Sequence, residues 1–515
     1  MINTKFCAKP ISLEVGGKPV VILNRQDADA MGLHALDRVM LKSDGKELVA
    51  IVDITTKFAK LGEVLTSDGV TSFFSLKAGN EIFVKPGKES ESVTFIKQKI
   101  AGNRLEKEKI RTIIKDVVER RLSDIELSAF VTTLKTRGMS MDEIEHMSRA
   151  MVETGKKLKF NRITVDKHSI GGICGDKTSL VLVPTVAAAG LTIPKTSSRA
   201  ITSPAGTADR MEVLAPVNFT VEEIEKIVNK TNGCLVWGGA LELAPADDIF
   251  IQIEYPLGID PLMLTSIMSK KKAVGAQYLV IDIPTGRGAK IKTIGEAHEL
   301  AEDFLELGKR LGIKVSCCVT FGEQPLGYAM GPALEAREAL LTLQGKGPAD
   351  LKEKVLNLAG TLFQMVGLES KLAKEILESG KAEKKMREII AAQGGNEKIK
   401  TGDISVGDEK AEIKSEKDGK VLWIKNAEMV TIAREAGAPR DKGAGILLNK
   451  KIGYPVRKGE NLFTVFAENS NKLENAVKLA EISEPIGVGK EIGERMLLDR
   501  IPTKIPHRRV FMLER

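Results

Sequence analysis

Aromatic side chains are scarce in this sequence: Phe, Tyr and Trp make up 4% of its 515 residues, and only two residues are Trp. Proteins that bind single-stranded nucleic acid stack its bases on exposed aromatic rings and therefore need more of them. The net charge of +8 is also modest for a chain of this length. We therefore expect no nucleic-acid partner, and we expect the surplus of Lys and Arg to bind small anions instead.

Cysteines are few, and long apolar segments and leader features are absent. The five cysteines are odd in number, and their spacing fits neither a disulfide framework nor paired CxxC motifs, so we expect reduced thiols. The longest apolar run, residues 179–193, is shorter than the roughly 20 residues of a membrane span and contains Pro184. The amino terminus lacks the basic and apolar regions of a secretory signal. These features predict a cytoplasmic protein with no membrane partner.

The rest of the composition, 43% hydrophobic and 28% charged, is that of an ordinary folded protein. Its length suggests about two to four domains. Only five residues are histidines, and no group of His, Cys, Asp and Glu stands at metal-ligand spacing. We therefore predict no metal site and no bound cofactor.

Changes in the sequence pattern divide the chain into three parts. Residues 1–86 carry short β-type runs separated by turn pairs such as Asp44-Gly45, which predicts a small β barrel. Residues 87–402 form the expected catalytic region, with a helical lobe (about 95–160 and 210–270) and an α/β lobe built on a parallel or mixed sheet. Residues 403–515 return to short strands between Gly-rich turns and predict a β-rich α+β domain. The predicted fold class is therefore multidomain α/β.

Capping boxes mark helix starts inside the catalytic region. A Ser or Thr followed three residues later by Glu satisfies the free amide groups of a first helical turn. The pattern occurs at Ser123, Ser140, Thr220 and Thr293. Beyond about residue 160, β-type runs such as RITVD (162–166) alternate with helical stretches, which indicates parallel strands joined by crossover helices.

One segment combines glycines with polar donors: DKHSIGGICGDKTS, residues 166–179. It follows a β-type run and leads directly into an apolar helix. Glycines let backbone amides approach an anion closely, and charged or hydroxyl groups beside a helix N-terminus add further donors. A phosphate site is one interpretation, and a tight strand-to-helix connection is the other, because Gly-rich turns are common before helices. The segment is neither a Walker A loop nor a dinucleotide-binding GxGxxG motif.

A second polar cluster, KTSSRAITSPAGTADR (195–210), also follows a β-type run. Its hydroxyls and Arg199 can supply several hydrogen-bond donors to phosphate oxygens. The alternative interpretation is a solvated loop rich in Ser and Thr. The presence of two such clusters in one chain favours oxyanion binding.

Together these segments resemble a known family. DKHSIGGICGDKTS, SSRAITSPAGTADRME, LAPADD and SIMSKKKAVGA are similar, in the same order, to the signature blocks of the thymidine and pyrimidine nucleoside phosphorylases. The additional amino-terminal domain and the length most closely resemble the archaeal AMP phosphorylase branch of that family. The resemblance covers nearly the whole chain. It implies a pentosyltransferase that splits the N-glycosidic bond of AMP, CMP or UMP with inorganic phosphate as co-substrate, releasing the base and ribose 1,5-bisphosphate during nucleotide degradation.

The resemblance also implies roles for individual residues. The attacking phosphate would be bound by Lys167, His168, Ser169, Gly171, Ser179 and Ser197. AMP would be bound by Gly172, Ser198, Arg199, Ala200, Ile201, Thr202, Ser203, Thr207, Ser266 and Lys290. For His168, a buried structural role is the alternative to ligand contact.

Cleavage leaves negative charge on the departing base, so the reaction needs a proton donor near it. The resemblance implies that Asp260 has this role; a helix cap just ahead of Pro261 is the alternative. Nearby the chain departs from the thymidine enzymes, because it has Glu254 and Tyr255 where they carry an Arg-Asp pair. Part of their pyrimidine clamp is therefore missing, which favours a nucleotide as substrate.

Several functions stay open from the sequence. Phosphorolysis of unphosphorylated nucleosides, which gives (deoxy)ribose 1-phosphate, is the main alternative. A phosphoribosyltransferase of the anthranilate type would share the architecture but would use magnesium and pyrophosphate chemistry without the KHSxGG loop. A non-enzymatic adaptor built on the two terminal domains is a third alternative. The resemblance further implies a homo-oligomer, either a dimer or a higher assembly.

Overall fold

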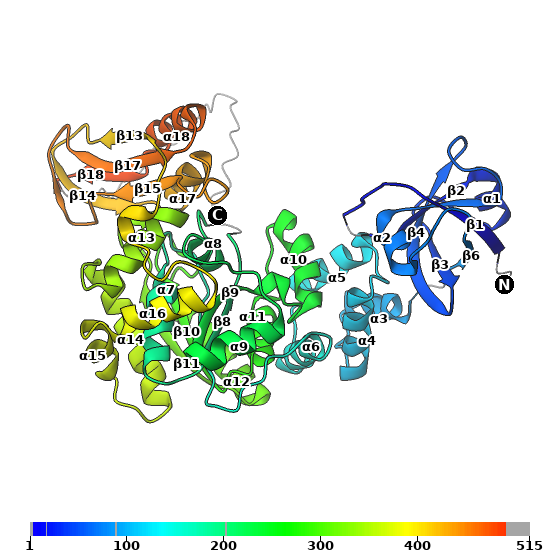
Figure 1. The fold of residues 1–515 in the computed structure, drawn as a ribbon, viewed down its shortest axis with the longest axis horizontal. Coiled ribbons are helices and arrows are strands. Elements are labelled where there is room, and N and C mark those ends of the chain that lie inside the picture. The colour runs from blue at the N-terminus through cyan, green and yellow to red at the C-terminus, as the bar shows by residue number, and fades with distance from the viewer. Residues whose placement is uncertain (1–3, 17, 88–89, 201–202, 491–515) are drawn as a thin grey trace, which may run out of the picture.

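The computed structural model describes residues 4–16, 18–87, 90–200 and 203–490 of the chain. Figure 1 shows an amino-terminal barrel on one side, a large central body, and a C-terminal domain packed on the far end of that body. The central body contains a helical lobe next to the barrel and an α/β lobe next to the C-terminal domain. The barrel, the central body and the C-terminal domain therefore follow one another in space as they do in the sequence.

The amino-terminal part is a closed barrel whose strands pair in the order β1-β5-β2-β4-β3-β6. Its elements are β1 (Thr4–Pro10), β2 (Val20–Asn24), α1 (Arg25–Ala30), β3 (Arg38–Ser43), β4 (Lys46–Thr55), β5 (Glu63–Thr66), α2 (Asp68–Phe74) and β6 (Glu81–Pro86). Alternating side chains such as Val21 and Leu23 are buried inside it. Closure leaves no unpaired strand edge, which protects a small β domain from edge-to-edge association. The barrel predicted from the sequence is confirmed.

The helical lobe contains two separate segments of the chain. Its helices are α3 (Glu91–Ile100), α4 (Lys107–Val118), α5 (Asp124–Arg137), α6 (Met141–Glu153), α10 (Pro245–Leu257) and α11 (Met263–Ala273). Phe130 of α5 and Phe250 of α10 meet in its core. Ion pairs of Arg38 with Glu126 and of Lys18 with Asp124 join the barrel to α5.

The second helical segment is shorter than the predicted range 210–270. Helices α8 (Thr207–Glu212) and α9 (Val221–Thr231) pack on the strands of the α/β lobe, because Met211 and Ile224 are buried in its clusters. The core of the helical lobe resumes only at Ala244. All four predicted capping boxes, at Ser123, Ser140, Thr220 and Thr293, are present with both of their hydrogen bonds.

The α/β lobe is built on parallel strands, as predicted. Strands β7 (Val165–Ser169), β10 (Tyr278–Thr285) and β11 (Lys314–Phe321) form one sheet in the order β11-β10-β7, and β8 (Ile193–Ser197) pairs with β9 (Gly233–Trp237). A parallel bridge between Thr164 and Thr192 connects the two groups. The surrounding helices are α7 (Thr178–Ala188), α12 (Ile294–Leu311), α13 (Pro332–Leu343), α14 (Ala349–Met365), α15 (Leu372–Glu378) and α16 (Lys381–Ala392), with short 3₁₀ turns at Gly238–Ala240 and Thr401–Asp403.

One strand lies later in the sequence than its predicted run RITVD (162–166). Strand β7 continues to Ser169, which is paired with Asp282 of β10, so the residues DKHS belong to the strand itself. A strand with such charged residues forms because buried partners of opposite charge surround Asp166 and Lys167. The glycine-rich loop therefore begins directly at the end of a central strand.

The C-terminal domain combines two small sheets with two helices. Its elements are β13 (Glu409–Lys414), β14 (Gly419–Ile424), α17 (Asn426–Glu435), β15 (Gly445–Leu448), β16 (Pro455–Val456), β17 (Asn461–Ala467), α18 (Ser470–Ser483) and β18 (Ile486–Gly489). One sheet has the order β12-β15-β17-β13, and the other β16-β14-β18. Because β12 (Ala329–Met330) comes from the α/β lobe, this sheet extends across the boundary between the two parts.

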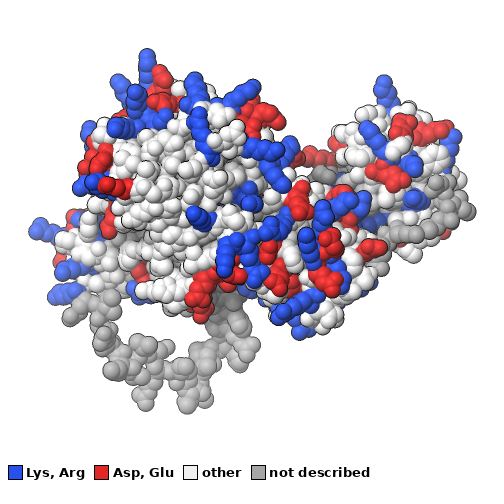
Figure 2. All heavy atoms as spheres, turned by 90° about the horizontal axis from the view of Figure 1, so that it is seen from below, with Lys and Arg blue, Asp and Glu red and all other residues white. Residues whose placement is uncertain are grey.

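The surface carries both signs of charge. Figure 2 shows Lys and Arg interleaved with Asp and Glu over the helical lobe and the barrel on the face that it draws. Basic residues are not gathered into one stripe on this face. Among the described helices, none is both long enough and apolar enough to cross a membrane.

A buried ion pair stabilises the connection between the glycine-rich segment and the chain around β12. Lys177, which is fully buried, pairs with Glu338 of α13 and donates hydrogen bonds to the carbonyl oxygens of Leu326 and Ala329. Removing one partner of such a pair leaves an uncompensated charge in the interior. The buried positive charge of Lys177 is therefore compensated by the Glu338 carboxylate.

We predict that Glu338→Gln lowers the free energy of unfolding by about 3 kcal/mol or more, because the lone Lys177 charge stays buried. Thermal unfolding should show a clear fall in Tm. Glu353→Gln, an exposed residue of the neighbouring α14, is the control and should leave Tm unchanged. The double variant Lys177→Met, Glu338→Gln should regain part of the loss. An unchanged Tm in Glu338→Gln would contradict the assignment.

Candidate active site

One pocket brings the two polar segments of the sequence together. Its volume is about 520 Å³, and it lies between the α/β lobe and helices α10 and α11 of the helical lobe. On the α/β side it is lined by the carboxyl ends of β7, β8 and β9 and by the loops that follow them. The predicted residues that line it are Lys167, His168, Ser169, Gly171, Gly172, Ser179, Ser197, Ser198, Arg199, Ala200, Ser203, Thr207 and Ser266. Ile201 and Thr202 lie outside the described residues.

The glycine-rich loop between β7 and α7 forms one part of this wall. Gly171 and Gly172 have φ angles of 84° and 95°, a region that L side chains rarely adopt. A Cβ atom on Gly172 would stand 2.2 Å from the backbone nitrogen of Lys290, so only glycine fits there. Ser169 precedes the loop, and Ser179 lies in the first turn of α7, where free backbone amides favour an anion.

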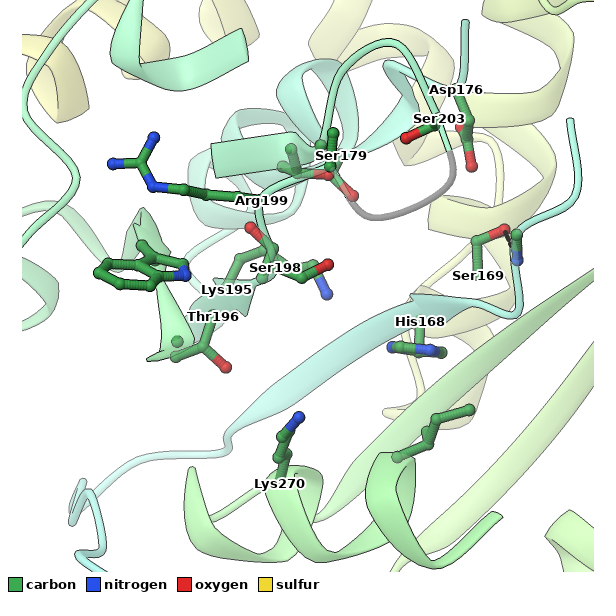
Figure 3. Close-up of a pocket in the computed structure, with 18 of the residues that line it drawn as sticks. His168, Ser169, Asp176, Ser179, Lys195, Thr196, Ser198, Arg199, Ser203 and Lys270 are labelled. Atoms are coloured by element: carbon green, nitrogen blue, oxygen red, sulfur yellow. Dashed lines mark hydrogen bonds between the residues drawn. The ribbon is translucent and has the colours of Figure 1, made fainter. Parts of the chain in front are cut away.

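The second loop, between β8 and α8, is shaped by one carboxylate. Asp209 accepts hydrogen bonds from the backbone amides of Ala200 (2.7 Å) and Gly206 (2.8 Å), which draws the two ends of the loop together. Figure 3 shows Ser198 from this loop and Ser169 from the end of β7 on opposite sides of one open space. Two sets of donors for oxyanions therefore share the pocket.

Arg199 is already paired within the protein. Its guanidinium makes two hydrogen bonds with the Glu212 carboxylate, at 2.8 and 2.5 Å, and lies 5.1 Å from the centre of the Trp237 ring. Figure 3 shows this group turned away from His168 and Ser169. Glu212 also pairs with Lys442 of the C-terminal domain at 2.6 Å. The Arg199 guanidinium also lies 3.3 Å from Asp209, so the protein itself supplies two acidic partners for Arg199.

Buried lysines form part of the pocket floor. The Nζ atom of Lys195 donates to the carbonyl oxygen of Lys167 (2.7 Å) and lies 3.6 Å from Asp166, which pairs with Lys271 at 2.6 Å. Burial lowers the pKa of Lys195 to about 7; Asp166 opposes this shift, while Lys271 and Lys167 add to it. Burial and the same lysines hold the pKa of His168 well below its usual value. At neutral pH, His168 is therefore an uncharged hydrogen-bonding group facing the pocket.

A second group of charges continues this cluster. Asp282 of β10 pairs with Lys354 (2.8 Å) and with Lys167 (3.7 Å), and Lys167 also lies 3.7 Å from Asp176. Burial alone would raise the pKa of Asp176, but Lys167 and Lys354 outweigh it and hold that pKa well below the usual range. Asp176 therefore stays ionised at the edge of the glycine-rich loop.

The opposite wall, from α10 and α11, contains residues that the sequence analysis did not assign. Asp248 and Lys270 line the pocket beside the predicted Ser266. Burial raises the pKa of Asp248 to about 6; Asp247 and Glu242 act in the same direction, and Lys270 acts against it. The signal available in the sequence was the LAPADD block, which contributed to the resemblance without an assigned role.

Asp260 and Lys290 do not line this pocket, in contrast to the prediction for the AMP site. Their side chains, each 43% exposed, form an ion pair with 2.6 Å between Nζ and Oδ2. The backbone of Lys290 nevertheless lies against Gly172, which does line the pocket. The ion pair therefore lies beside the glycine-rich loop. The Asp260 carboxylate, which is bound to the Lys290 ammonium, is not part of the pocket lining.

Glu254 and Tyr255, which stand where the thymidine enzymes carry an Arg-Asp pair, also do not line the pocket. Glu254 is buried near the end of α10, where its carboxylate accepts a hydrogen bond from the backbone amide of Leu262 at 3.3 Å. Burial raises its pKa to about 7, and the negative charges of Asp260 and Asp247 act in the same direction. This acidic residue thus contributes to the local charge balance without contacting the pocket. In the described part of the chain, no three His, Cys, Asp or Glu residues are placed to hold a metal ion.

Comparison with known families matches three consecutive parts of the chain. Residues 93–155 match the helical bundle domain of a glycosyl transferase family, and residues 161–383 match its a/b domain. Residues 421–486 match the pyrimidine nucleoside phosphorylase C-terminal domain. A solved anthranilate phosphoribosyltransferase from Thermus thermophilus aligns with 58% of this chain and 99% of its own, with 22% identity and a TM-score of 0.49.

Curated relatives match over nearly the full length. AMP phosphorylase from Thermofilum pendens is 48% identical over 96% of this chain and 97% of its own. AMP phosphorylase from Thermococcus kodakarensis is 50% identical over 94% of this chain and 97% of its own, and that from Methanocaldococcus jannaschii is 48% identical over 95% and 98%. With this identity along nearly the whole chain, the chain belongs to the AMP phosphorylase family.

Proposed function

We propose that the protein catalyses phosphorolysis of AMP, and also of CMP and UMP, in nucleotide degradation. The products are the free base and ribose 1,5-bisphosphate. The observation that supports this most directly is the meeting of two loops, one rich in glycine and one rich in hydroxyls, in a single pocket. A nucleotide and inorganic phosphate bring two separate anions to the reaction, and each loop offers donors for one of them.

In the proposed reaction, an oxygen of inorganic phosphate attacks C1′ of the ribose while the bond from C1′ to the base breaks. The bonding electron pair leaves with the base, which then takes up a proton. Ser169, Ser179 and the amides at the start of α7 bind the attacking phosphate. Lys167 and the uncharged His168 contact the same anion, and the other buried lysines of the pocket floor stabilise its negative charge.

The 5′-phosphate is bound by the β8–α8 loop and by Lys290. When this phosphate takes the Lys290 ammonium, Asp260 loses its partner, and closure of the two lobes brings its carboxyl group toward the departing base. This exchange explains how Asp260 can serve as the proton donor although the unliganded pair stands outside the pocket lining.

We also propose that the protein acts in the cytoplasm. All five cysteines are free thiols, which fits a reducing compartment such as the cytoplasm. We further propose that the protein acts as a homo-oligomer and needs no cofactor, with phosphate as co-substrate.

The decisive assay incubates the purified protein with phosphate and either AMP, adenosine or thymidine, and identifies the sugar product. We expect ribose 1,5-bisphosphate from AMP. Formation of ribose 1-phosphate from adenosine, or of deoxyribose 1-phosphate from thymidine, with no product from AMP would reassign the enzyme to nucleosides.

We predict that Asp260→Asn binds AMP with unchanged affinity but loses turnover by about 100-fold or more, because a positioned general acid contributes about 10²–10⁴-fold to a rate. Binding can be measured by calorimetry and turnover by release of adenine. Asp142→Asn, which removes another exposed carboxylate that is ion-paired with Arg310, is the control and should match the parent. Full turnover in Asp260→Asn would remove Asp260 from the mechanism.

We also predict that phosphate binding is coupled to proton uptake by Lys195. At about pH 8, one unit above the pKa of Lys195, most of its side chain is neutral, and a bound anion favours the charged form. Near pH 6 the amine is already protonated, so the uptake disappears. Calorimetry in two buffers of different ionisation enthalpy measures the protons taken up per phosphate. Lys195→Gln should bind phosphate more weakly and without uptake at either pH; equal uptake in parent and variant would contradict the assignment.

A further inference from the structure

Asp248 is a pocket residue for which no role has been assigned so far. It lies near the start of α10, on the wall opposite the two anion-binding loops. Its side chain is half-buried, and no hydrogen bond or ion pair connects it to any described residue. The adjacent Asp247 is different, because it pairs with Lys270 at 2.5 Å. Asp248 therefore presents an unpartnered carboxylate to the pocket, which is costly unless a ligand compensates it.

The surroundings of Asp248 suit a flat heterocycle. The apolar residues Leu243, Ile251 and Ile267 line the same side of the pocket, together with the polar groups of Ser266 and Lys270. Figure 3 shows Lys270 projecting from its helix across the open space from Lys195 and Ser198. Apolar surface with a few polar groups is the usual lining for a base, whereas the anions bind at the other wall.

We propose that Asp248 determines base specificity by accepting a hydrogen bond from the exocyclic amino group of adenine or cytosine. The inference rests on the proposed phosphorolysis of nucleoside monophosphates and adds a specificity-determining residue to it. Three polar groups lie on this wall. The Lys270 ammonium can only donate hydrogen bonds and the Ser266 hydroxyl can donate or accept them, whereas the ionised Asp248 carboxylate can only accept them. Uracil has a carbonyl oxygen where cytosine has its amino group, and that oxygen meets the carboxylate as a second acceptor.

The charges around Asp248 keep it ready for this role at neutral pH. Lys270 on α11 attracts the carboxylate, whereas Asp247 on α10 and Glu242 just before that helix repel it. With a pKa of about 6, the group is mostly ionised at neutral pH and accepts hydrogen bonds. Below this pH it becomes protonated, and its preference for an amino group is lost.

The first experiment compares AMP, CMP and UMP as substrates of the full-length protein and of Asp248→Asn. We expect kcat/KM for AMP and CMP to fall by about tenfold or more, because a hydrogen bond to a charged group is lost. We expect kcat/KM for UMP to stay within about threefold or to rise, because the new amide can donate to its carbonyl oxygen. Asp303→Asn, whose carboxylate lies on α12 away from the pocket, is the matched control and should leave all three values unchanged.

A second measurement uses the unmodified protein, so that the test does not depend on folding of the variant. The AMP to UMP ratio of kcat/KM should fall as the pH drops through 6, because titration of inorganic phosphate and of the 5′-phosphate is common to both substrates and cancels. IMP, which carries a carbonyl oxygen in place of the amino group of AMP, should be a poorer substrate than AMP by about tenfold or more.

The outcomes separate this inference from the proposed function. If the parent protein releases a base from AMP but Asp248→Asn loses AMP and UMP activity equally, Asp248 is not a specificity residue, although the function stands. Equal use of AMP and IMP, or a ratio that does not change with pH, overturns the inference in the same way. If the parent protein releases no base from any nucleotide, the proposed function itself fails.

Discussion

The site depends on an imbalance of charge at the pocket floor. The side chains of Lys167, Lys195, Lys271 and Lys354 share the carboxylates of Asp166, Asp176 and Asp282, and nearly all of these groups are buried. Burying an ion is costly unless a partner compensates it, and four lysines cannot each have an aspartate of their own among three. Burial is the main cause of the lowered pKa of Lys195, and the positive charges of Lys271 and Lys167 lower it further. In the proposed reaction, bound phosphate would supply negative charge beside this cluster, which would link phosphate binding to the stability of the cluster.

The parallel sheet gives this cluster its position. Because all its strands run the same way, their carboxyl ends meet at one edge, and ligands bind there in open α/β sheets. Strand β7 contributes Lys167 from inside the sheet and Ser169 from its end, while β8 contributes Lys195 and Ser197 in the same way. Buried lysine side chains and half-buried hydroxyls therefore come from the same two strands. The strands hold the lysines in place, and the loops that follow the strands line the pocket.

Local features of this fold could be predicted from the sequence, but features set by distant contacts could not. The capping boxes at Ser123 and Ser140 need only neighbours three residues away, and the structure has both. The polar loops were recognisable for the same reason, because their residue types define their chemistry. The charged strand β7 was misplaced because its charges are compensated by residues more than a hundred positions away, such as Lys271. Asp248 was missed because burial, and not its sequence neighbours, gives the carboxylate its character.

The C-terminal domain contacts the glycine-rich loop and helix α8, which follows the second loop, although none of its described residues line the pocket. Asn426 at the start of α17 accepts a hydrogen bond from the backbone amide of Cys174 and donates one to the carbonyl oxygen of Gly322, which holds the glycine-rich loop against the chain after β11.

At the second loop, Glu212 bridges Arg199 and Lys442. Hydrogen bonds from these two cations lower the pKa of Glu212 to about 2, so it is a carboxylate at neutral pH. If Arg199 turned to a ligand phosphate, as the proposed function requires, Lys442 would stay behind as the counter-ion of Glu212. Such an exchange would leave no unpaired carboxylate at Glu212, and the C-terminal domain would thus lower the cost of releasing the arginine.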